Sequence, residues 1–245
     1  MIDSNKNKQK ILKKFLEISK ISGWNDQSLE KAAIESDIDP QNLIFIFPNS
    51  VLDVAELYVK NGNDQLRKEI SKIKNFDDNK IRDKIRLCLY KRFEIEIFNR
   101  QILINLAKFY QDPKNIVNID TGLRPSAQSV KFSFIIADLI WIILKDQSSD
   151  YNYYSKRLIL AKILVKSFFV FISDESKDIA KTKDCIDSEI EKVMHFEKFK
   201  HRSKEFLNNV KDSIDDCLIA DDGSIKNIGK LIKEMPFIRL LKKND

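Results

Sequence analysis

The 245-residue sequence has few of the residues that interrupt helices: five glycines and five prolines are scattered along it without a low-complexity run. This scarcity argues against long irregular regions and favours helices with short connections. Apolar residues instead recur at three- and four-residue spacing almost from end to end, and no segment shows convincing strand-like alternation. The sequence therefore predicts an all-α fold.

Cysteine is also sparse, with Cys88, Cys185 and Cys217 scattered singly. An odd number of widely spaced cysteines does not suit a disulfide-stabilised exported protein, and each is expected to be a small buried residue. No apolar run reaches the roughly twenty residues that span a bilayer. Residues 1–10 are polar and lysine-rich, without a signal core or transit-peptide bias. We therefore expect a cytoplasmic protein.

Motifs for catalysis are missing as well. His195 and His201 are the only histidines, and the spacing from Glu191 to His195 differs from the Glu-x-x-His repeat of di-iron bundles. There is no glycine-rich phosphate loop, no CxxC and no nucleophile elbow. These absences predict a non-enzyme with no metal site, no catalytic residue and no intrinsic cofactor.

Residues 1–50 predict three short helices. The first spans about residues 6–22 and ends at Gly23, because glycine is a common residue just past a helix end. The second opens with Asp26 as its N-cap, and the third lies within residues 39–48. A tight break between the second and third helices is typical of a helix-turn-helix unit. The end of the third resembles the end of the reading helix in TetR-type regulators.

Charge argues against DNA binding by this unit. Residues 1–50 hold seven lysines, no arginine and seven acidic residues, whereas DNA affinity rests on basic residues that neutralise phosphates. The reading segment, residues 37–47, has two acids and no base, and only Gln41 and Asn42 could read bases. Its apolar residues 43–47 suit packing more than a major groove. Nucleic acid is therefore not an expected partner.

Residues 51–218 form the larger predicted domain. Two of its segments, residues 132–144 and 158–172, are apolar almost all round, and such helices must be buried on all faces. They either pack into a solid core or enclose a cavity, and composition alone favours the solid core. If there is a cavity, its candidate lipid-binding residues are Trp141, Leu160, Leu164, Phe168 and Phe171.

A polar and aromatic stretch, residues 145–157, separates these two segments. Asp, Ser and Asn within residues 146–152 indicate a turn, and Asp150 or Asn152 can cap the helix that follows. Three tyrosines and a Lys-Arg pair therefore lie at a helix start. Either the rings pack locally and the basic pair is solvated, or the stretch is a docking surface, since Tyr and Arg are enriched at interface hot spots.

The residues in and around this stretch resemble a known family, the Coq-nine accessory proteins of ubiquinone (coenzyme Q) biosynthesis. The matching positions are Trp141 and residues 146–148, 150–157, 174–176 and 190–194. The similarity covers roughly residues 120–200. Two positions depart from the family pattern: Tyr153 stands where eukaryotic members carry tryptophan, and Lys145 stands where a glycine is usual.

The resemblance implies a fold, a ligand and a partner. Coq-nine proteins share the TetR-type fold, and their pocket takes a lipid or an isoprenoid quinone intermediate, which is presented to the di-iron hydroxylase of the pathway. Helices over residues 150–172 and 179–199 are expected to form a two-fold homodimer, as in TetR-like proteins. Eukaryotic members work in mitochondria, and we interpret this chain as a bacterial member. The partner-binding positions carried over by match are Ile140, Asp150, Tyr153, Tyr154 and Arg157.

Two other classes of function stay open at this point. A ligand-responsive transcriptional repressor of TetR type would share the fold and the pocket, although the charge of the reading segment argues against it. A structural membrane adaptor would have no pocket at all. Solvent extraction of bound lipid separates the adaptor from a lipid carrier.

Residues 226–243 predict a basic amphipathic helix after a linker at residues 221–224. Six basic residues oppose one acid, Glu234, so most of the chain's formal net charge of +6 lies here. Such a helix is typical of a membrane-surface or partner-binding element. Two alternatives are that its apolar face packs on the protein itself or that Pro236 breaks it. Because Coq-nine proteins end in such a helix, we expect it to bind the anionic inner face of the inner membrane. The membrane-binding candidates are Ile228, Leu231, Ile232, Met235, Ile238, Leu241, Lys230 and Lys233.

Overall fold

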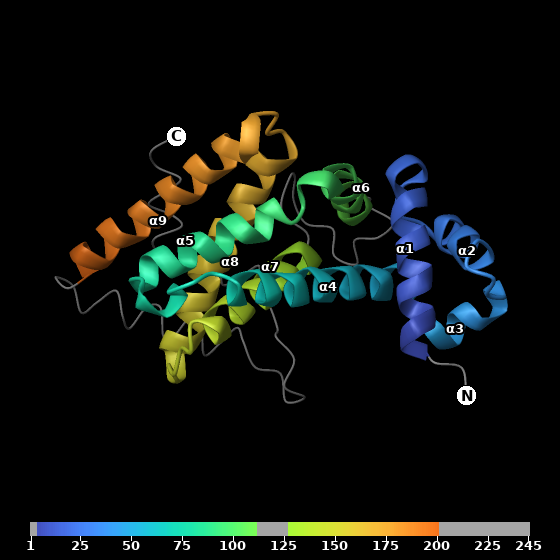
Figure 1. Cartoon of the computed structure of the whole chain (residues 1–245), viewed down its shortest axis with the longest axis horizontal. Coiled ribbons are helices and arrows are strands. Elements are labelled where there is room, and N and C mark those ends of the chain that lie inside the picture. Colours follow the sequence, from blue (N-terminus) through green and yellow to red (C-terminus); the bar gives the residue numbers. More distant parts are fainter. Residues whose placement is uncertain (1–3, 112–126, 201–245) are drawn as a thin grey trace. The chain divides into compact units, whose positions relative to one another are not determined.

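The computed structural model describes residues 4–111 and 127–200, which form helices joined by turns. These residues contain no β-strand, so the all-α prediction is confirmed for them. Figure 1 shows these helices, coloured along the chain. They belong to two compact units, each built from segments that are not contiguous in sequence. The TetR-type arrangement and the predicted boundaries at residues 50 and 218 stay predictions.

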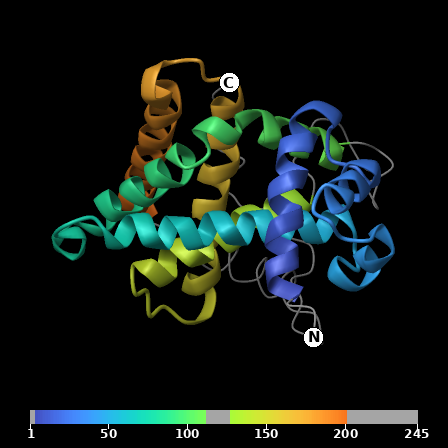
Figure 2. The ribbon, with the colours of Figure 1, turned by 45° about the vertical axis from the view of Figure 1, so that its right-hand side comes forward.

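The first unit is centred on Trp24. Its described residues are 4–74, 91–111 and 171–173. Its described helices are α1 (Ser4–Ser22), α2 (Asp26–Ile34), α3 (Leu43–Ile46), α4 (Val51–Ser71) and α6 (Arg100–Gln111). The Trp24 indole N–H donates to the carbonyl of Ile102 at 3.0 Å, and the Phe15 ring meets the indole edge-on with centroids 4.9 Å apart. Both views show α1 beside α2 and α3, and this packing buries the apolar face of α1 (Figure 2).

The ends of α1 and α2 follow local rules. Gly23 ends α1 with φ +79°, in the left-handed region that glycine adopts without strain, so the predicted C-cap is confirmed. The N-cap of α2 is Asn25, whose side-chain oxygen accepts the Ser28 N–H at 2.8 Å. The predicted cap, Asp26, instead accepts from the Ser50 hydroxyl. The prediction was wrong by one residue because Asn and Asp are comparably good caps.

The short helix α3 follows a 3-10 turn, Pro40–Asn42, as expected for the third helix of the N-terminal unit. Ile46 and Phe47 are buried, which agrees with the predicted packing role. Ile44 and Phe45 are 68% and 81% exposed, so for these two side chains the packing prediction was wrong. A four-residue helix has too little surface to bury all of its apolar side chains.

A buried ion pair lies beside α4 in this unit. Arg92, in the last turn of α5 (Ile81–Glu94), places Nη1 2.5 Å from Glu96 Oε1, and the Tyr58 hydroxyl of α4 donates to the same carboxylate. Burial, with the neighbouring Glu96 carboxylate, raises the pKa of Tyr58, so its hydroxyl keeps the proton that it donates. Gly62 makes room for this pair, because a Cβ at that position would lie 3.0 Å from Arg92 Nη2.

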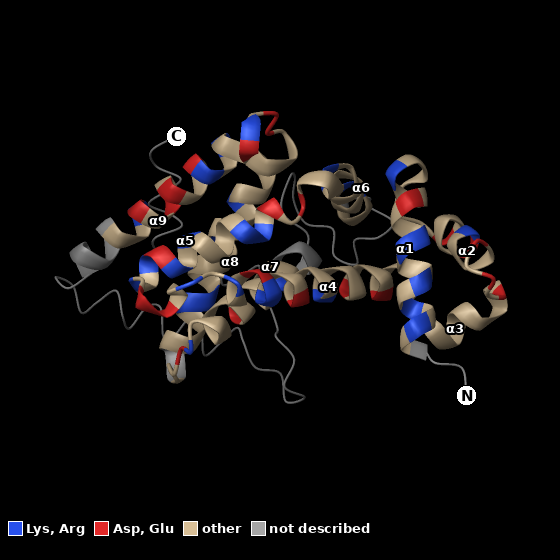
Figure 3. Cartoon of the chain, viewed as in Figure 1, with Lys and Arg blue, Asp and Glu red and all other residues tan. Residues whose placement is uncertain are grey.

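In the second unit, ion pairs connect α5 to α9. Its described residues are 75–90, 127–170 and 174–200. Its described helices are the first part of α5, α7 (Ala127–Ile143), α8 (Asp150–Ile172) up to Val170, and α9 (Ala180–Lys200). Arg86 Nε and the Tyr90 hydroxyl both donate to Asp187, each at 2.6 Å, and Arg82 pairs with Glu191 at 3.3 Å. Residues of both signs accordingly lie along α5 and α9, whereas α7 and α8 contain the two predicted apolar segments (Figure 3).

The turn before α9 is organised by Asp174. Its carboxylate accepts the backbone N–H groups of Ser176 at 2.9 Å and Thr182 at 2.8 Å, together with both of their hydroxyls. Burial alone would raise the pKa of Asp174, but these hydrogen bonds outweigh it and lower the pKa to about 2. The carboxylate therefore stays ionised and satisfies backbone donors at the helix start.

Two expectations concerning cysteines and membranes can be compared with the described residues. Cys88 is fully buried, and burial raises the pKa of its thiol to about 12, whereas Cys185 is half-buried. Cys217 lies outside the described part of the chain. Within that part, no single helix has the length and hydropathy of a membrane span; Pro40–Ile46 and Val51–Ser71 meet the criterion only as a pair bent by 61°.

Candidate functional site at the α7–α8 corner

Helix α7 ends in a left-handed turn at Lys145. The N–H of Lys145 donates to the carbonyl of Ile142, and the N–H of Asp146 donates to that of Trp141, both at 3.0 Å. This is the Schellman pattern of helix termination, in which the residue after the cap takes a positive φ. Lys145 has φ +58°. The position where Coq-nine proteins usually carry glycine is therefore one where a side chain is strained.

Replacing Lys145 by glycine should raise the free energy of unfolding by about 0.5–1 kcal/mol, because relief of the left-handed strain exceeds the entropy cost of glycine. The Lys145–Asp77 ion pair would be lost, but its side chains are 73% and 66% exposed and solvent screens it. Urea denaturation followed by circular dichroism measures the change. Lys145→Ala is the matched control: it loses the same ion pair, keeps the strain and should gain no stability. A glycine variant no more stable than the alanine variant would contradict the prediction.

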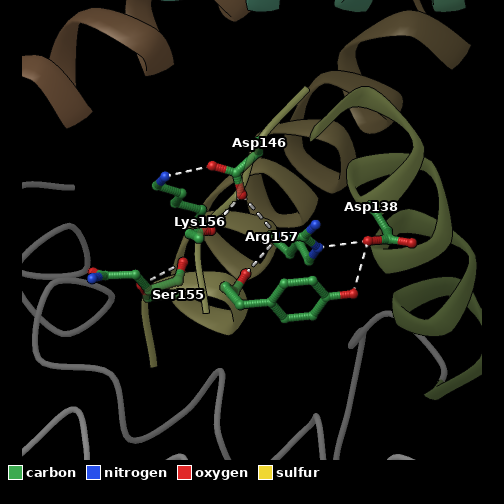
Figure 4. A network of polar contacts seen from close by, with 8 residues as sticks. Asp138, Asp146, Ser155, Lys156 and Arg157 are labelled. Carbon is green, nitrogen blue, oxygen red and sulfur yellow. Dashed lines mark hydrogen bonds and ion pairs between the residues drawn. The ribbon is translucent and has the colours of Figure 1, made fainter. Parts of the chain in front are cut away.

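Arg157 links α7, α8 and the turn between them (Figure 4). Its Nε donates to Asp138 on α7 at 2.6 Å, and its Nη1 donates to Asp146 at 3.4 Å and to the Tyr153 carbonyl at 3.0 Å. Lys156 adds a second bond to Asp146 at 2.7 Å. We call Asp138, Asp146, Tyr153, Lys156 and Arg157 the corner cluster. It fixes the direction in which the chain leaves α7 and enters α8.

Burial makes this cluster different from a surface ion pair. The side chains of Arg157 and Asp146 are only 3% and 7% exposed. Burial alone would raise the pKa of Asp146, but hydrogen bonds from Lys156, Ser148 and Arg157 outweigh it and lower the pKa. Two carboxylates therefore share the arginine: Asp146 is almost removed from water, whereas the side chain of Asp138 is 31% exposed. A charge in that position depends on its partners to offset desolvation.

Tyr153 is braced by the same cluster. Its hydroxyl donates to Asp138 at 3.0 Å, and the Arg157 guanidinium lies 3.4 Å from the centre of its ring. Burial and the Asp138 carboxylate raise the pKa of Tyr153, so the phenol remains protonated. The ring of Tyr154 meets it edge-on at 5.0 Å. Both tyrosines are half-buried and keep part of their surface accessible.

Two members of the predicted partner-binding patch are buried. Ile140 is fully buried and Arg157 is 2% exposed, so in this conformation neither offers a surface to a partner. Arg157 is not solvated, because it pairs with Asp138 and Asp146, and its part in partner binding stays a prediction. Tyr153 and Tyr154 stay candidates for contact. The side chain of Asp150 is outside the described part of the chain.

Three members of the corner cluster were not among the predicted partner-binding residues: Asp138, Asp146 and Lys156. One signal for Asp138 was present, since it is an acid within an apolar helix, where an ionised group is rarely left without a partner. Lys156 also lies 5.0 Å from the centre of the Trp141 ring, a cation–π contact that covers the indole. No pattern within residues 145–157 indicates that Lys156 and Arg157 pair with Asp146 and Asp138.

The candidate lipid-binding residues do not all belong to one unit. Trp141, Leu160 and Leu164 are buried and Phe168 is half-buried, all within the second unit. Phe171 belongs to the first unit, where its ring lies 5.3 Å from that of Phe93. Their buried positions fit apolar core residues. A shared role in binding lipid stays a prediction.

Several other candidates fall outside the described residues. These are the membrane-binding positions Ile228, Leu231, Ile232, Met235, Ile238, Leu241, Lys230 and Lys233, together with His201 and the side chain of His195. Within residues 4–111 and 127–200, no group of three or more His, Cys, Asp or Glu side chains could hold a metal ion.

Comparison with known proteins finds a family match for the segment that contains the corner cluster. The family model described as COQ9 matches residues 126–197. This segment belongs to the COQ9 family. The chain is also 26% identical over 210 residues to the "Probable ubiquinone biosynthesis protein coq9, mitochondrial" of Dictyostelium discoideum. That alignment covers 81% of this chain and 63% of the relative, so the chain spans less than two thirds of the relative's length. The matched COQ9 segment takes in α7, α8 and most of α9.

Proposed function

We propose that the protein is a non-catalytic accessory factor of ubiquinone biosynthesis. In this proposal it binds an isoprenoid quinone intermediate or another lipid, lies peripherally on the membrane, and presents the ligand to a hydroxylase of the pathway. The observation that carries the proposal is the COQ9 segment, residues 126–197, whose α7–α8 corner holds two accessible tyrosines on a buried ionic support. Rigid aromatic side chains of this kind are typical contact residues.

The lipid part of the proposal is supported by α7 and α8. Both carry apolar residues around most of their circumference, and Ile140, Leu160 and Leu164 are among those buried in the second unit. The full-length protein should be extracted with organic solvent and the extract examined by mass spectrometry. We expect lipid or isoprenoid in about stoichiometric amounts. Extracts no richer in lipid than those of an unrelated protein purified in parallel would reject lipid carriage.

Tyr154→Lys should weaken binding of the pathway hydroxylase by more than about 2 kcal/mol, because hot-spot aromatic residues lose that much on substitution. Calorimetric titration against the hydroxylase measures the loss, and the melting temperature should change little, since Tyr154 is outside the corner cluster. Phe98→Lys is the control, because Phe98 is an aromatic residue that is 90% exposed elsewhere on the chain. Equal losses of hydroxylase affinity in both variants would show that Tyr154 has no specific role in binding.

Removing residues 226–245 should abolish binding to vesicles that contain phosphatidylglycerol or cardiolipin. Six apolar side chains at roughly 1 kcal/mol each and basic residues at about 1 kcal/mol each give a gross gain of about 10 kcal/mol. Helix ordering offsets much of it, at about 1–2 kcal/mol per residue before hydrogen bonds form, so binding should be reversible and weakened by salt.

Vesicle flotation checks this prediction with two further variants. Leu231→Glu combined with Ile232→Glu should be as damaging as the truncation, because it places charge in the apolar face. Ile21→Glu is the control, since Ile21 is 92% exposed on α1 and outside the tail. A truncated protein that still floats with anionic vesicles would refute the membrane role of the tail.

DNA-binding repression is not favoured as a second function. The exposed side chains of α3 include Ile44 and Phe45, and the reading segment, residues 37–47, contains no base. Phosphate contacts from basic residues supply most of the affinity for DNA. A gel-shift assay against genomic fragments separates the two functions.

A further inference from the structure

An open hollow lies within the first unit. Its volume is about 600 Å³, inside the range of about 300–1,000 Å³ that is usual for small-ligand sites. Its wall comes from the turn between α1 and α2, the start of α4 and one face of α6, where Asn105, Lys108 and Phe109 lie within about one turn of each other. All of the lining residues belong to the first unit, so that unit alone forms the hollow.

Part of the wall is apolar. The apolar lining residues are Trp24, Val51, Leu52 and Phe109. The indole of Trp24 is fixed by its hydrogen bond to the Ile102 carbonyl and by its edge-on contact with Phe15. Leu52 is 41% exposed and Phe109 is half-buried. Hydrocarbon surface is therefore available to a ligand in the hollow.

Two amide side chains of the wall are engaged in holding it together. Asn25 donates to the Ser22 carbonyl at 2.8 Å, and Asn105 donates to the carbonyls of Ser19 and Lys20 at 2.8 and 3.1 Å. These bonds tie the start of α2 and one face of α6 to the end of α1. The wall is thus built before a ligand arrives, and its charged side chains are the polar groups left to bind one.

The wall contains one acidic and one basic residue, Asp26 on α2 and Lys108 on α6. Asp26 accepts from the Ser50 hydroxyl, and the side chain of Lys108 is exposed. In the part of the chain that the structure describes, neither residue has an ion-pair partner, and they do not pair with each other. The next acid, Asp53, is not in the wall and accepts from Asn49. The hollow therefore offers one negative and one positive group beside an apolar surface.

We propose that the hollow binds a zwitterionic molecule with an apolar part, whose ammonium pairs with Asp26 and whose anionic oxygen pairs with Lys108. A ligand with a single charge would meet a wall residue of like charge, and a hydrocarbon would cover both charged residues without pairing with them. A zwitterion pairs with both, while its apolar part covers Trp24, Leu52 and Phe109. Two sources carry this chemistry: a free amino acid with a large apolar side chain and the headgroup of phosphatidylethanolamine. The proposal is independent of the role in ubiquinone biosynthesis.

The full-length protein is titrated calorimetrically with phenylalanine and, separately, with dihexanoyl phosphatidylethanolamine below its micelle concentration. The short-chain lipid presents the headgroup without a vesicle, so the basic tail does not dominate the measurement. Saturable binding of phenylalanine identifies a free amino acid as a sufficient ligand. Saturable binding of the lipid alone identifies the headgroup, and failure of both ligands to bind overturns the proposal.

Analogues that lack one charge test the need for a zwitterion. Phenylpropionate and phenylethylamine keep the ring of phenylalanine but lack its ammonium and its carboxylate, respectively, and dihexanoyl phosphatidic acid lacks the ammonium of the lipid. Each analogue should bind about tenfold or more weakly than its zwitterion, as expected for loss of a charge-assisted hydrogen bond. An analogue that binds as tightly as its zwitterion would overturn the proposal.

Two substitutions assign the charged residues. Asp26→Asn keeps the shape of the side chain and an acceptor for the Ser50 hydroxyl. It should lower the affinity for the zwitterion about tenfold without lowering that for the anionic analogue, phenylpropionate or dihexanoyl phosphatidic acid. Lys108→Met should lower the affinity for both ligands. A purely structural role of Asp26 would weaken both ligands alike, and that result would overturn its assignment.

Glu30→Gln and Lys31→Met are the matched controls. Both residues are exposed on α2 and neither lines the hollow. They remove the same kinds of charge as Asp26→Asn and Lys108→Met, so any general effect of net charge on binding appears in them as well. Affinity for the zwitterion should be unchanged in both controls. Losses equal to those of the two wall variants would show that the ligand does not contact Asp26 and Lys108.

Discussion

Arg157→Leu should lower the free energy of unfolding by about 3–5 kcal/mol, the range expected when one partner of a buried ion pair is removed. The substitution leaves Asp146, whose side chain is 7% exposed, with Lys156 as its remaining cationic partner, and it removes the arginine from Asp138. Urea denaturation followed by circular dichroism measures the loss. The effect should be much larger than that of a typical surface substitution.

Lys156→Gln is the matched control for this result. Lys156 bonds the same carboxylate from the next position on α8, but its side chain is 38% exposed, so its loss should cost less than about 1 kcal/mol. If Arg157→Leu proved no more destabilising than Lys156→Gln, water would be solvating the Asp146 carboxylate in place of the arginine. Arg157 would then return as a candidate contact residue.

Glu96→Leu is expected to have a similar effect in the first unit, with a loss of about 3–5 kcal/mol. The substitution leaves the 6% exposed Arg92 without its partner carboxylate and removes the acceptor of the Tyr58 hydroxyl. The surface variant Glu69→Ala, which breaks a pair with the exposed Lys72, should cost less than about 1 kcal/mol.

A double-mutant cycle separates the buried charge from simple loss of packing. Replacing both members of a buried ion pair by apolar residues is often close to neutral. Glu96→Leu combined with Arg92→Met should therefore be less destabilising than Glu96→Leu alone. A double variant whose loss equals the sum of the two single losses would show that the ion pair has no coupling energy.

The helices were predictable because their signals are local. The apolar spacing of α4 and α8, and the glycine at position 23, are contained within short stretches of sequence and need no knowledge of the rest of the fold. The error at the start of α2 has the same origin. Asn25 and Asp26 satisfy the same capping rule, and only the surrounding chain, with Ser50 as the partner of Asp26, separates them.

The interior position of Arg157 was not predictable from its neighbours in sequence. Residues 145–157 are polar, and such a stretch favours a surface interpretation, yet Arg157 is buried by a contact with Asp138, nineteen residues away. Whether an arginine faces water or a carboxylate depends on tertiary packing. The left-handed conformation of Lys145 was likewise not predicted, although a glycine is usual at that position in Coq-nine proteins.

The brace on Tyr153 has a consequence for the kinetics of association. Its hydroxyl donates to Asp138 and its ring lies against the Arg157 guanidinium. These contacts restrict the side chain to one rotamer in the unbound protein. Ordering a loose side chain at an interface costs about 0.5–1.5 kcal/mol. A hydroxylase that docks on this ring would avoid that cost, and the saving would appear as a longer residence time of the complex, with little change in the rate of encounter.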